Sequence, residues 1–301
     1  MADSSGIEWT DATWNPTTGC DRTSPGCDGC YALSMARRLK AMGVPEYQTD
    51  GRPETSGPGF GFAMHEHRLD QPLHWARARR VFVDSMSDLF HPRATTSFLA
   101  DVFAVMATNL LSDKDTHTFQ VLTKRPKRMR SLLNSDTFRN DVATRAAARF
   151  EPDRRDTIRA GVRFNWPLPN VWLGVSVEDQ QHADERIPEL LTANASLRFL
   201  SCEPLLGPVD LTSFGTFYGG DPREDTWPLL DWVIVGGESG PGARLMDPAW
   251  AQALRDQCAD GSIPFFFKQT GTQLARRWGL PGKGHDPADW REPWPQETPN
   301  A

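Results

Sequence analysis

Short apolar runs rich in Val, Phe, Ile and Leu alternate with amphipathic segments along most of the chain. Such runs are typical of buried parallel strands. The pattern predicts six of them, at 80–84, 118–123, 171–177, 198–201, 232–235 and 264–268, and a less regular first strand at 7–13. Helices are predicted between them, for example at 95–111 and after Asp247-Pro248. This alternation predicts an α/β fold with parallel strands, arranged as a partial or closed (β/α) barrel.

The domain organisation follows from the same pattern. We expect a single barrel domain over residues 1–278, with a loop at 14–31 that carries three cysteines. Three stretches interrupt the alternation and are expected to be loops or insertions, near 43–62, 151–169 and 211–228. Residues 279–301 form a Pro- and charge-rich C-terminal tail that either lies over the surface or is disordered.

The composition is that of an ordinary globular protein. The chain has 301 residues, 39% of them hydrophobic and 24% charged, with a net charge of −6. We find neither an N-terminal leader pattern nor an apolar stretch near the ~20 residues that a membrane helix needs, so we expect a cytoplasmic protein without a membrane partner. An acidic chain is not a general nucleic-acid binder. The stretch 124–130 nevertheless holds five basic residues, either a local binding patch or a solvated helix face.

Polar and charged residues follow nearly every predicted strand. In a parallel α/β barrel the C-terminal ends of the strands carry the reactive groups, and a structural turn there needs little more than one capping residue. The sequence therefore predicts a ligand site at this rim. Its polar segments are 84–88, 123–125, 176–179, 201–204, 236–240 and 268–271.

Three of the five cysteines lie within eleven residues. Cys20, Cys27 and Cys30 are spaced C-x6-C-x2-C in a loop whose glycines and proline allow tight turns. The crowding is poor for a disulfide framework and good for thiolate ligation. A helix is predicted directly after Cys30, and its N-terminus would stabilise negative charge on the sulfurs.

Three alternatives remain for the three cysteines, which are an iron–sulfur cluster, a zinc ion or no metal at all. Three thiolates can hold a [4Fe–4S] cluster and leave one iron open, which we favour, whereas structural zinc needs a fourth protein ligand. His65 and His67 are candidates for that ligand. Cys202 and Cys258 stand alone, and Cys258 lies on an apolar helix face, as a core thiol does.

Several strings carry a family resemblance. TWNPTTGC, SPGCDGCYA, MSDLF, LTKRP, GVSVED, SCEPLLGP, GGESG and FFFKQTG resemble an uncharacterised phage and bacterial three-cysteine family, which is similar to the radical SAM superfamily and distantly to spore photoproduct lyase. The resemblance covers Ile7 to about Gly271. Its first cysteine spacing is six residues here and three in the usual radical SAM motif.

The resemblance implies an enzyme and its cofactors. A [4Fe–4S] cluster on Cys20, Cys27 and Cys30 would bind S-adenosylmethionine (SAM) and cleave it by one-electron reduction to a radical that abstracts a substrate hydrogen. An electron donor such as flavodoxin or ferredoxin would be a partner. The implied SAM-binding residues are Ser85 and Asp88 for the amino group, Lys124 and Arg125 for an anionic group, and Ser176 and Glu178 for the ribose. Glu203, Glu238 and Lys268 would line the substrate side as catalytic residues.

The substrate remains open at this point. A phage-type family and the basic stretch favour a nucleic-acid base or nucleotide, in DNA repair or modification, and a peptide or small molecule is the alternative. The rival function is a zinc- or Fe–S-stapled nucleic-acid-binding protein without radical chemistry. The sequence leaves the oligomeric state undefined.

Overall fold

The computed structural model describes residues 5–214, 230–290 and 294–299, so most of the predicted insertion at 211–228 lies outside the described residues. The chain forms two compact units. The first comprises Met1–Arg22, Ala32–Leu173 and Thr192–Leu197, and the second comprises Thr23–Tyr31, Gly174–Leu191 and Arg198–Ala301. The expectation of one domain over 1–278 stays a prediction, because compactness alone does not decide whether the units fold independently.

Parallel strands form the centre of the first unit. β1 (Ala12–Trp14) pairs with β4 (Arg80–Val83), which pairs with β5 (Thr118–Thr123). β6 (Val171–Ser176) begins beside β5 in this unit and ends in the second. Every residue of β6 is buried, which explains why its sequence is a continuous apolar run.

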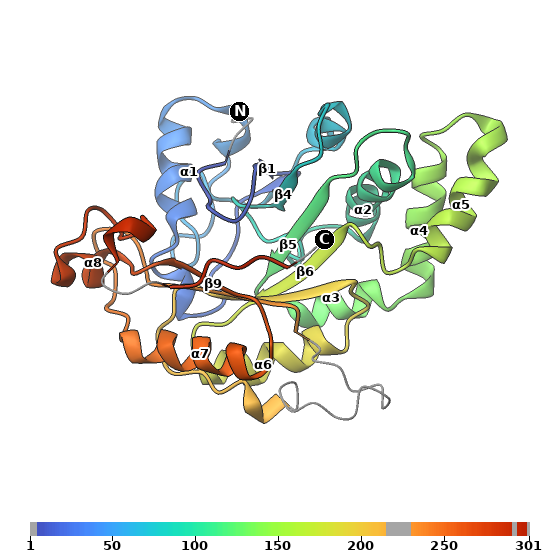
Figure 1. Cartoon of the computed structure of the whole chain (residues 1–301). Coiled ribbons are helices and arrows are strands. Elements are labelled where there is room, and N and C mark those ends of the chain that lie inside the picture. Colours follow the sequence, from blue (N-terminus) through green and yellow to red (C-terminus); the bar gives the residue numbers. More distant parts are fainter. Residues whose placement is uncertain (1–4, 215–229, 291–293, 300–301) are drawn as a thin grey trace. The chain divides into compact units, whose positions relative to one another are not determined.

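The helices of the first unit begin where the sequence supplies caps. α2 (Thr96–Leu111) starts after Thr95, whose Oγ1 accepts the N–H of Phe98 at 3.1 Å, and it overlaps the helix predicted at 95–111. α2 packs against α4 (Asp136–Ala147), which packs against α5 (Arg155–Phe164) (Figure 1). α5 is thus a helix inside the segment 151–169. The remaining helices of this unit are α1 (Tyr31–Ala41), whose first residue belongs to the second unit, and α3 (Pro126–Leu133).

A second, small sheet lies in the first unit. β2 (Thr17–Thr18) pairs antiparallel with β3 (Ala63–Met64), which directly follows the predicted insertion 43–62. The insertion therefore returns to the segment that leads into Cys20. Short 3-10 helices complete the described elements: η1 (Pro25–Cys27), η2 (Pro45–Tyr47), η3 (Glu66–Arg68), η4 (Gln71–His74), η5 (Pro152–Arg154), η6 (Thr212–Phe214) and η7 (Pro287–Asp289).

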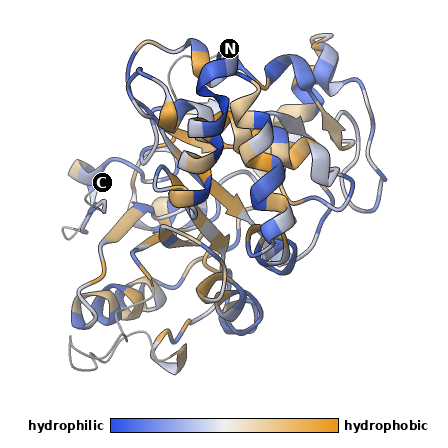
Figure 2. Ribbon diagram, turned by 90° about the vertical axis from the view of Figure 1, so that its right-hand side faces the viewer, coloured by the Kyte–Doolittle hydropathy of each residue, from blue (hydrophilic) through white to orange (hydrophobic). Residues whose placement is uncertain are grey.

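The second unit continues the same alternation. After β6 come α6 (Gln180–Leu191), β7 (Leu197–Cys202), β8 (Trp232–Gly236), α7 (Pro248–Asp260), β9 (Phe265–Gln269) and α8 (Thr272–Trp278). β7 with β8 and β8 with β9 pair in parallel. The strands are the most uniformly hydrophobic segments of the ribbon (Figure 2). Asp247 caps α7 by accepting the N–H of Ala249 at 2.9 Å, as its sequence predicts.

The strand order of the large sheet is β1-β4-β5-β6-β7-β8-β9. The prediction of an α/β fold with parallel strands is confirmed, and each of the seven predicted strands overlaps an observed one. β1 and β9 stand at the two ends of the order, so the closed-barrel alternative is not confirmed. In the described ranges, no helix has both the length and the apolar character required to cross a bilayer.

The described part of the C-terminal tail is packed against β9. Residues 294–297 run beside this strand, and Gln296 forms an antiparallel bridge with Phe266. Trp294 stacks on Phe267 with ring centroids 4.3 Å apart, and Trp290 meets the same ring edge-on at 5.1 Å. The tail thus covers an edge strand and contributes to the core of the second unit.

We predict that Trp294→Ala destabilises the protein by about 3–5 kcal/mol, because it removes a buried indole from this aromatic stack. Denaturant unfolding measures the change. Phe164→Ala is the matched control, since Phe164 is 89% exposed and should change the free energy of unfolding by less than about 0.5 kcal/mol. Equal stability of Trp294→Ala and the wild type would contradict the packed tail.

Candidate metal centre

Cys20 belongs to the first unit and follows a constrained glycine. Gly19 has φ +79°, and a Cβ there would lie less than 3.0 Å from the carbonyl oxygen of Gly61. The N–H of Gly19 donates to the carbonyl of Met86 at 2.9 Å, and Ser87 Oγ donates to the Gly19 carbonyl at 2.6 Å. The segment after β4 and the end of the 43–62 insertion therefore fix the backbone at Cys20.

Asp84 anchors the chain just before this glycine. Its two carboxyl oxygens accept the N–H of Thr17 at 3.0 Å and the hydroxyl of Thr17 at 2.8 Å. Burial raises the pKa of Asp84 to about 8, with the charge of Asp88 adding to the rise and the Thr17 hydrogen bonds opposing it. The residue has φ +59°, a conformation that Asp and Asn tolerate better than most side chains.

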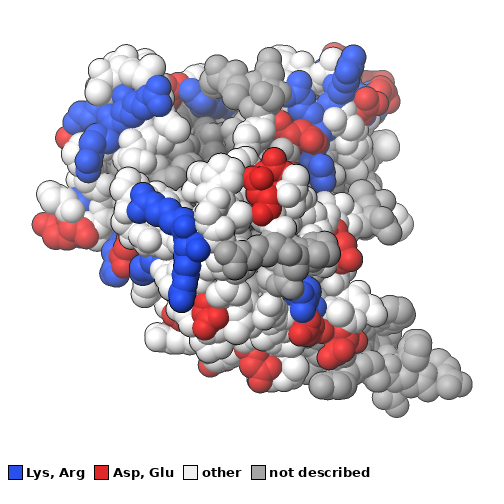
Figure 3. All heavy atoms as spheres, turned by 60° about the vertical axis from the view of Figure 1, so that its left-hand side comes forward, with Lys and Arg blue, Asp and Glu red and all other residues white. Residues whose placement is uncertain are grey.

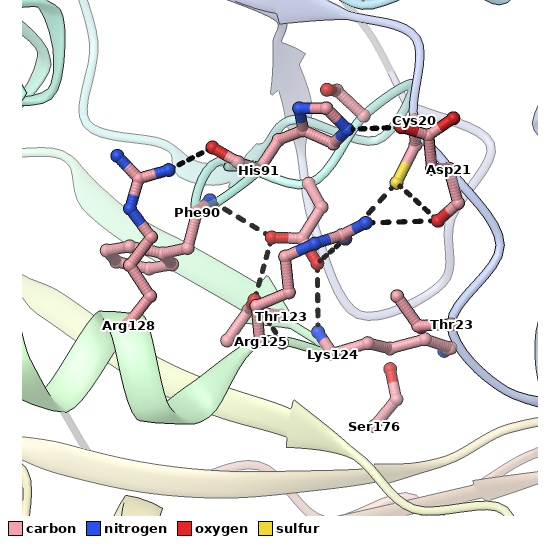
Figure 4. A network of polar contacts seen from close by, with 12 residues as sticks. Cys20, Asp21, Thr23, Phe90, His91, Thr123, Lys124, Arg125, Arg128 and Ser176 are labelled. Atoms are coloured by element: carbon pink, nitrogen blue, oxygen red, sulfur yellow. Dashed lines mark hydrogen bonds and ion pairs between the residues drawn. The ribbon is translucent and has the colours of Figure 1, made fainter. Parts of the chain in front are cut away.

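Arg125 is the charged neighbour of the Cys20 sulfur. Its Nη1 donates to Cys20 Sγ at 3.4 Å and to Asp88 Oδ2 at 2.9 Å, and its Nη2 donates to the carbonyl of Asp21 at 3.0 Å (Figure 4). Burial lowers the pKa of Arg125, but the charges of Asp88 and Cys20 outweigh it and the pKa is raised. The guanidinium therefore stays charged beside the sulfur.

Asp88 organises the strand ends around that arginine. Its Oδ1 accepts the Thr123 hydroxyl at 2.7 Å and the N–H of Phe90 at 3.0 Å, and its Oδ2 accepts the N–H of Lys124 at 3.0 Å (Figure 4). These bonds join the segments after β4 and β5. Asp88, predicted to bind SAM, is thus engaged with the protein itself.

Asp21, next to Cys20, is also fixed. Its Oδ2 lies 3.0 Å from Nε2 of His91, and its Oδ1 accepts the hydroxyls of Thr55 at 2.8 Å and Ser56 at 3.3 Å. Burial raises the pKa of Asp21, but these hydrogen bonds and His91 outweigh it, so the pKa is lowered. Thr55 and Ser56 lie in the 43–62 insertion, which therefore holds the first cysteine segment.

Cys27 and Cys30 belong to the second unit, in the turn that includes η1. The N–H of Cys27 donates to the carbonyl of Ser24 at 2.9 Å, and the N–H of Cys30 donates to the carbonyl of Cys27 at 3.3 Å. The hydroxyls of Thr23 and Ser24 lie 3.7 and 3.9 Å from Cys27 Sγ. The second and third cysteines thus sit on a tight, hydrogen-bonded turn, and α1 begins directly after Cys30.

Glu178, which follows β6, contacts this turn. It is fully buried, pairs with Arg186 of α6 at 2.9 Å, and accepts the Ser24 hydroxyl at 2.7 Å. Gly26 packs so closely on it that an added Cβ would lie less than 3.0 Å from three Glu178 atoms. The glutamate predicted to bind a ribose is therefore in contact with the cysteine turn.

Glu238, after β8, supports the turn in the same way. It pairs with Arg244, whose Nη2 also donates to the carbonyl of Pro25 at 2.9 Å. A Cβ on Gly29 would lie less than 3.0 Å from Glu238 Oε1. Burial raises the pKa of Glu238, but the hydrogen bonds and charge of Arg244 outweigh it and the pKa is lowered. Glu238 is thus a charged contact of the turn.

The two other predicted substrate-side residues form a pair of their own. Lys268 Nζ lies 2.9 and 2.8 Å from the two carboxylate oxygens of Glu203, one of which accepts the side-chain amide of Gln269 at 2.7 Å. Their side chains are 13% and 19% exposed. The structure therefore brings Glu203 and Lys268 together at the ends of β7 and β9, in the second unit.

The remaining predicted SAM-binding residues have structural contacts. Ser85 Oγ donates to Asn15 Oδ1 at 3.2 Å in the first unit, and the N–H of Lys124 donates to Asp88. Ser176 is buried in the second unit, and its carbonyl accepts Arg186 Nη1 at 2.8 Å. Their roles toward SAM stay predictions.

The basic stretch 124–130 does not present all its charges to solvent. Arg125 is bound at Cys20, and Arg128 donates to the carbonyls of His91 and Ala94. Lys127 and Arg130 are exposed on α3. The drawn face of the molecule carries basic and acidic side chains interspersed (Figure 3). Part of the stretch therefore serves the fold, and nucleic-acid binding stays a prediction.

The three cysteine thiols would need a fourth protein ligand to form a structural zinc site. Cys20, Cys27 and Cys30 are partly exposed, reduced thiols. His65, a candidate fourth zinc ligand, is buried with its Nε2 2.8 Å from Thr18 Oγ1, and His67 Nε2 lies 3.4 Å from Glu46. Over the described ranges, no three His, Cys, Asp or Glu side chains adopt the geometry of a metal site. A metal at these cysteines therefore stays a prediction, which rests on the type of the donor atoms and on the support of each cysteine segment.

Sequence reasoning missed the arginines that neutralise the glutamates. Arg186 is buried on α6 among Ala183, Ile187 and Leu190, and a charged residue on an apolar helix face is a signal that was available. Arg244 lies in a loop, where no periodic pattern singles it out. Cys202 and Cys258 are buried core thiols, and burial raises the pKa of both, that of Cys258 to about 12.

Comparison with known proteins yields one match. A family model with the description "Protein of unknown function (DUF5131)" matches residues 4–290. No curated protein and no solved structure matches the chain.

We predict that Asp84→Asn flattens the pH dependence of stability. A carboxyl whose pKa rises from 3.8 to about 8 on folding stabilises the fold fully below pH 3.8, and this contribution is lost as the pH rises to about 8. Unfolding free energies of the wild type should fall with a slope of up to about 1.4 kcal/mol per pH unit from this group. Asn mimics the neutral acid and tolerates the positive φ.

Denaturant titrations at pH 5, 6, 7 and 8 measure this dependence. Asp153→Asn, at an exposed position, is the control and should keep the wild-type slope. The same slope in Asp84→Asn and Asp153→Asn would show that Asp84 is not protonated in the fold.

Proposed function

The chain belongs to the DUF5131 family, whose function is unknown, and we propose that it is a [4Fe–4S] enzyme of the radical SAM type. Cys20, Cys27 and Cys30 would hold the cluster. The parallel sheet would be the partial barrel of that superfamily, in a cytoplasmic protein. When bound, such a cluster with one open iron supplies the electron that cleaves SAM.

The strongest support for the proposal is the close packing of the turn that carries the second and third cysteines. Gly26 and Gly29 each lie against a carboxylate that an arginine neutralises. Supports of this kind fix the orientation of metal ligands and control metal affinity. Both supports lie at the carboxyl ends of strands, where ligand sites of parallel sheets lie.

The thiols also have surroundings that favour thiolates. The guanidinium of Arg125 donates to Cys20 Sγ, and hydroxyl groups lie near Cys27 Sγ. Cys30 precedes the N-terminus of α1, whose dipole favours negative charge. These features lower the cost of presenting thiolates to iron.

Glu203 and Lys268 are our candidates for the residues that act on the substrate. They lie at strand ends of the second unit, where they pair with each other and Glu203 also accepts the side-chain amide of Gln269. Such an ion pair can hold a proton or bind a polar group of the substrate. We propose a nucleic-acid base or nucleotide as substrate and a small one-electron carrier as partner.

A second function has its own support. Asp88, Glu178 and Glu238, three of the acids expected to bind SAM or substrate, bond to arginines around the cysteine segments. A cluster or zinc ion that only staples the fold of a binding protein would need this support and no SAM pocket. The assay below separates the two functions.

The first test is anaerobic purification and reconstitution, with iron and sulfide analysis and an assay for 5′-deoxyadenosine after addition of dithionite and SAM. We expect about four iron and four sulfide per chain and formation of 5′-deoxyadenosine. Both should be lost in Cys20→Ala, Cys27→Ala and Cys30→Ala, because each removes a ligand. Cys258→Ala is the matched control and should keep both, since Cys258 is a buried thiol of α7.

A protein with iron and sulfide that leaves SAM intact would support the staple and refute the radical enzyme. One zinc per chain would refute the cluster.

A second prediction tests whether the close packing of the turn on Glu178 matters for metal binding. Gly26→Ala places a methyl group against Glu178 and should weaken iron retention roughly tenfold or more in competition with a chelator. Gly242→Ala, where the added Cβ meets open space, should retain iron as the wild type does. Wild-type retention in Gly26→Ala would show that the close packing does not matter for the metal.

A further inference from the structure

Hydrogen bonds from several sides fix the position of Arg125, in addition to its contact with Cys20. Thr123 Oγ1 accepts the backbone N–H of Arg125 at 2.9 Å and donates to Asp88 Oδ1 at 2.7 Å, while Asp88 Oδ2 accepts the guanidinium. These hydrogen bonds close a ring that runs from the backbone of Arg125 through the hydroxyl of Thr123 and the carboxylate of Asp88 to the guanidinium of Arg125 (Figure 4). The side chain is only 12% exposed.

A fixed, poorly hydrated positive charge at a ligand sulfur has a defined electrostatic effect. Reduction of a cluster adds one electron and therefore one negative charge. A cation and its N–H group at the sulfur stabilise the more negative, reduced form, and weak solvent screening strengthens the effect. The Arg125 Nη1–Cys20 Sγ distance of 3.4 Å places the donor in the first layer around the ligand.

The neighbouring arginine of the basic stretch does not share this position. Arg128, one turn further along, directs its N–H groups to the carbonyls of His91 and Ala94. The bond to Cys20 Sγ therefore gives Arg125 a role that neither its charge nor its place in the basic stretch implies.

We propose that Arg125 is a positioning residue that raises the reduction potential of the cluster by donating a charged N–H to Cys20. This inference rests on the proposed cluster at Cys20, Cys27 and Cys30. It replaces the expectation that Arg125 binds an anionic group of SAM or substrate, because the guanidinium is already shared among Cys20, Asp88 and Asp21.

The test is a redox titration of the reconstituted protein, with dithionite as electron donor and the reduced cluster followed by electron paramagnetic resonance. At a fixed potential, Arg125→Gln should lower the ratio of reduced to oxidised cluster about tenfold, which for one electron equals a shift of about 59 mV. Arg125→Lys keeps the charge without the planar fork and should fall between Arg125→Gln and the wild type. Arg128→Gln is the matched control and should titrate as the wild type does.

Each outcome decides the proposal. A wild-type protein that takes up no iron and sulfide overturns both the cluster and this inference. A loaded Arg125→Gln protein with the wild-type ratio overturns this inference alone, and so does an equal shift in Arg128→Gln, which would make the effect one of net charge. Where Arg125→Gln holds no cluster, Arg125→Lys decides, and a ratio equal to that of the wild type overturns the inference.

Discussion

A carboxylate that leaves water needs a counter-charge, and the structure meets this need three times at the carboxyl ends of its strands. Each acid is neutralised by one arginine, and each arginine has a further N–H that donates to a backbone carbonyl. The pairs are Asp88–Arg125, Glu178–Arg186 and Glu238–Arg244. Breaking any of them would leave a buried charge beside a cysteine segment, so the backbone there depends on all three.

This use of the acids changes how the rim of strand ends is understood. Glu178 and Glu238 contact the turn that carries two cysteines, instead of lying open toward a ligand. Chemistry on a substrate would then fall to groups that the cysteine segments do not bind, of which Glu203 and Lys268 are the best placed in the second unit. The residues that hold the cysteine segments in place are thus distinct from the residues that could act on a substrate.

The strands and the cysteine motif could be predicted because their signals are local. A run such as 118–123 is buried along most of its length, so its composition alone reports a strand. Partners across the fold have no such signal, and Arg244 meets Glu238 only because a loop returns to the end of β8. The sequence predicts a tail that lies over the surface or is disordered, because its many prolines conceal that Trp290 and Trp294 are buried. Whether the two edge strands pair and close a barrel depends on the whole sheet, so no local signal in the sequence predicts it.

The cysteine turn and its supports are far apart in the order of synthesis. Cys27 and Cys30 leave the ribosome early, whereas Glu238 is made about 200 residues later, after roughly 10–40 s at ordinary rates of translation. Until then the nascent chain carries its thiols on a segment that lacks at least one of the two carboxylates against which Gly26 and Gly29 later pack. If the proposed cluster binds here, metal delivered before Glu238 is made would meet an incomplete site, so insertion of the cluster would have to follow synthesis of this part of the chain.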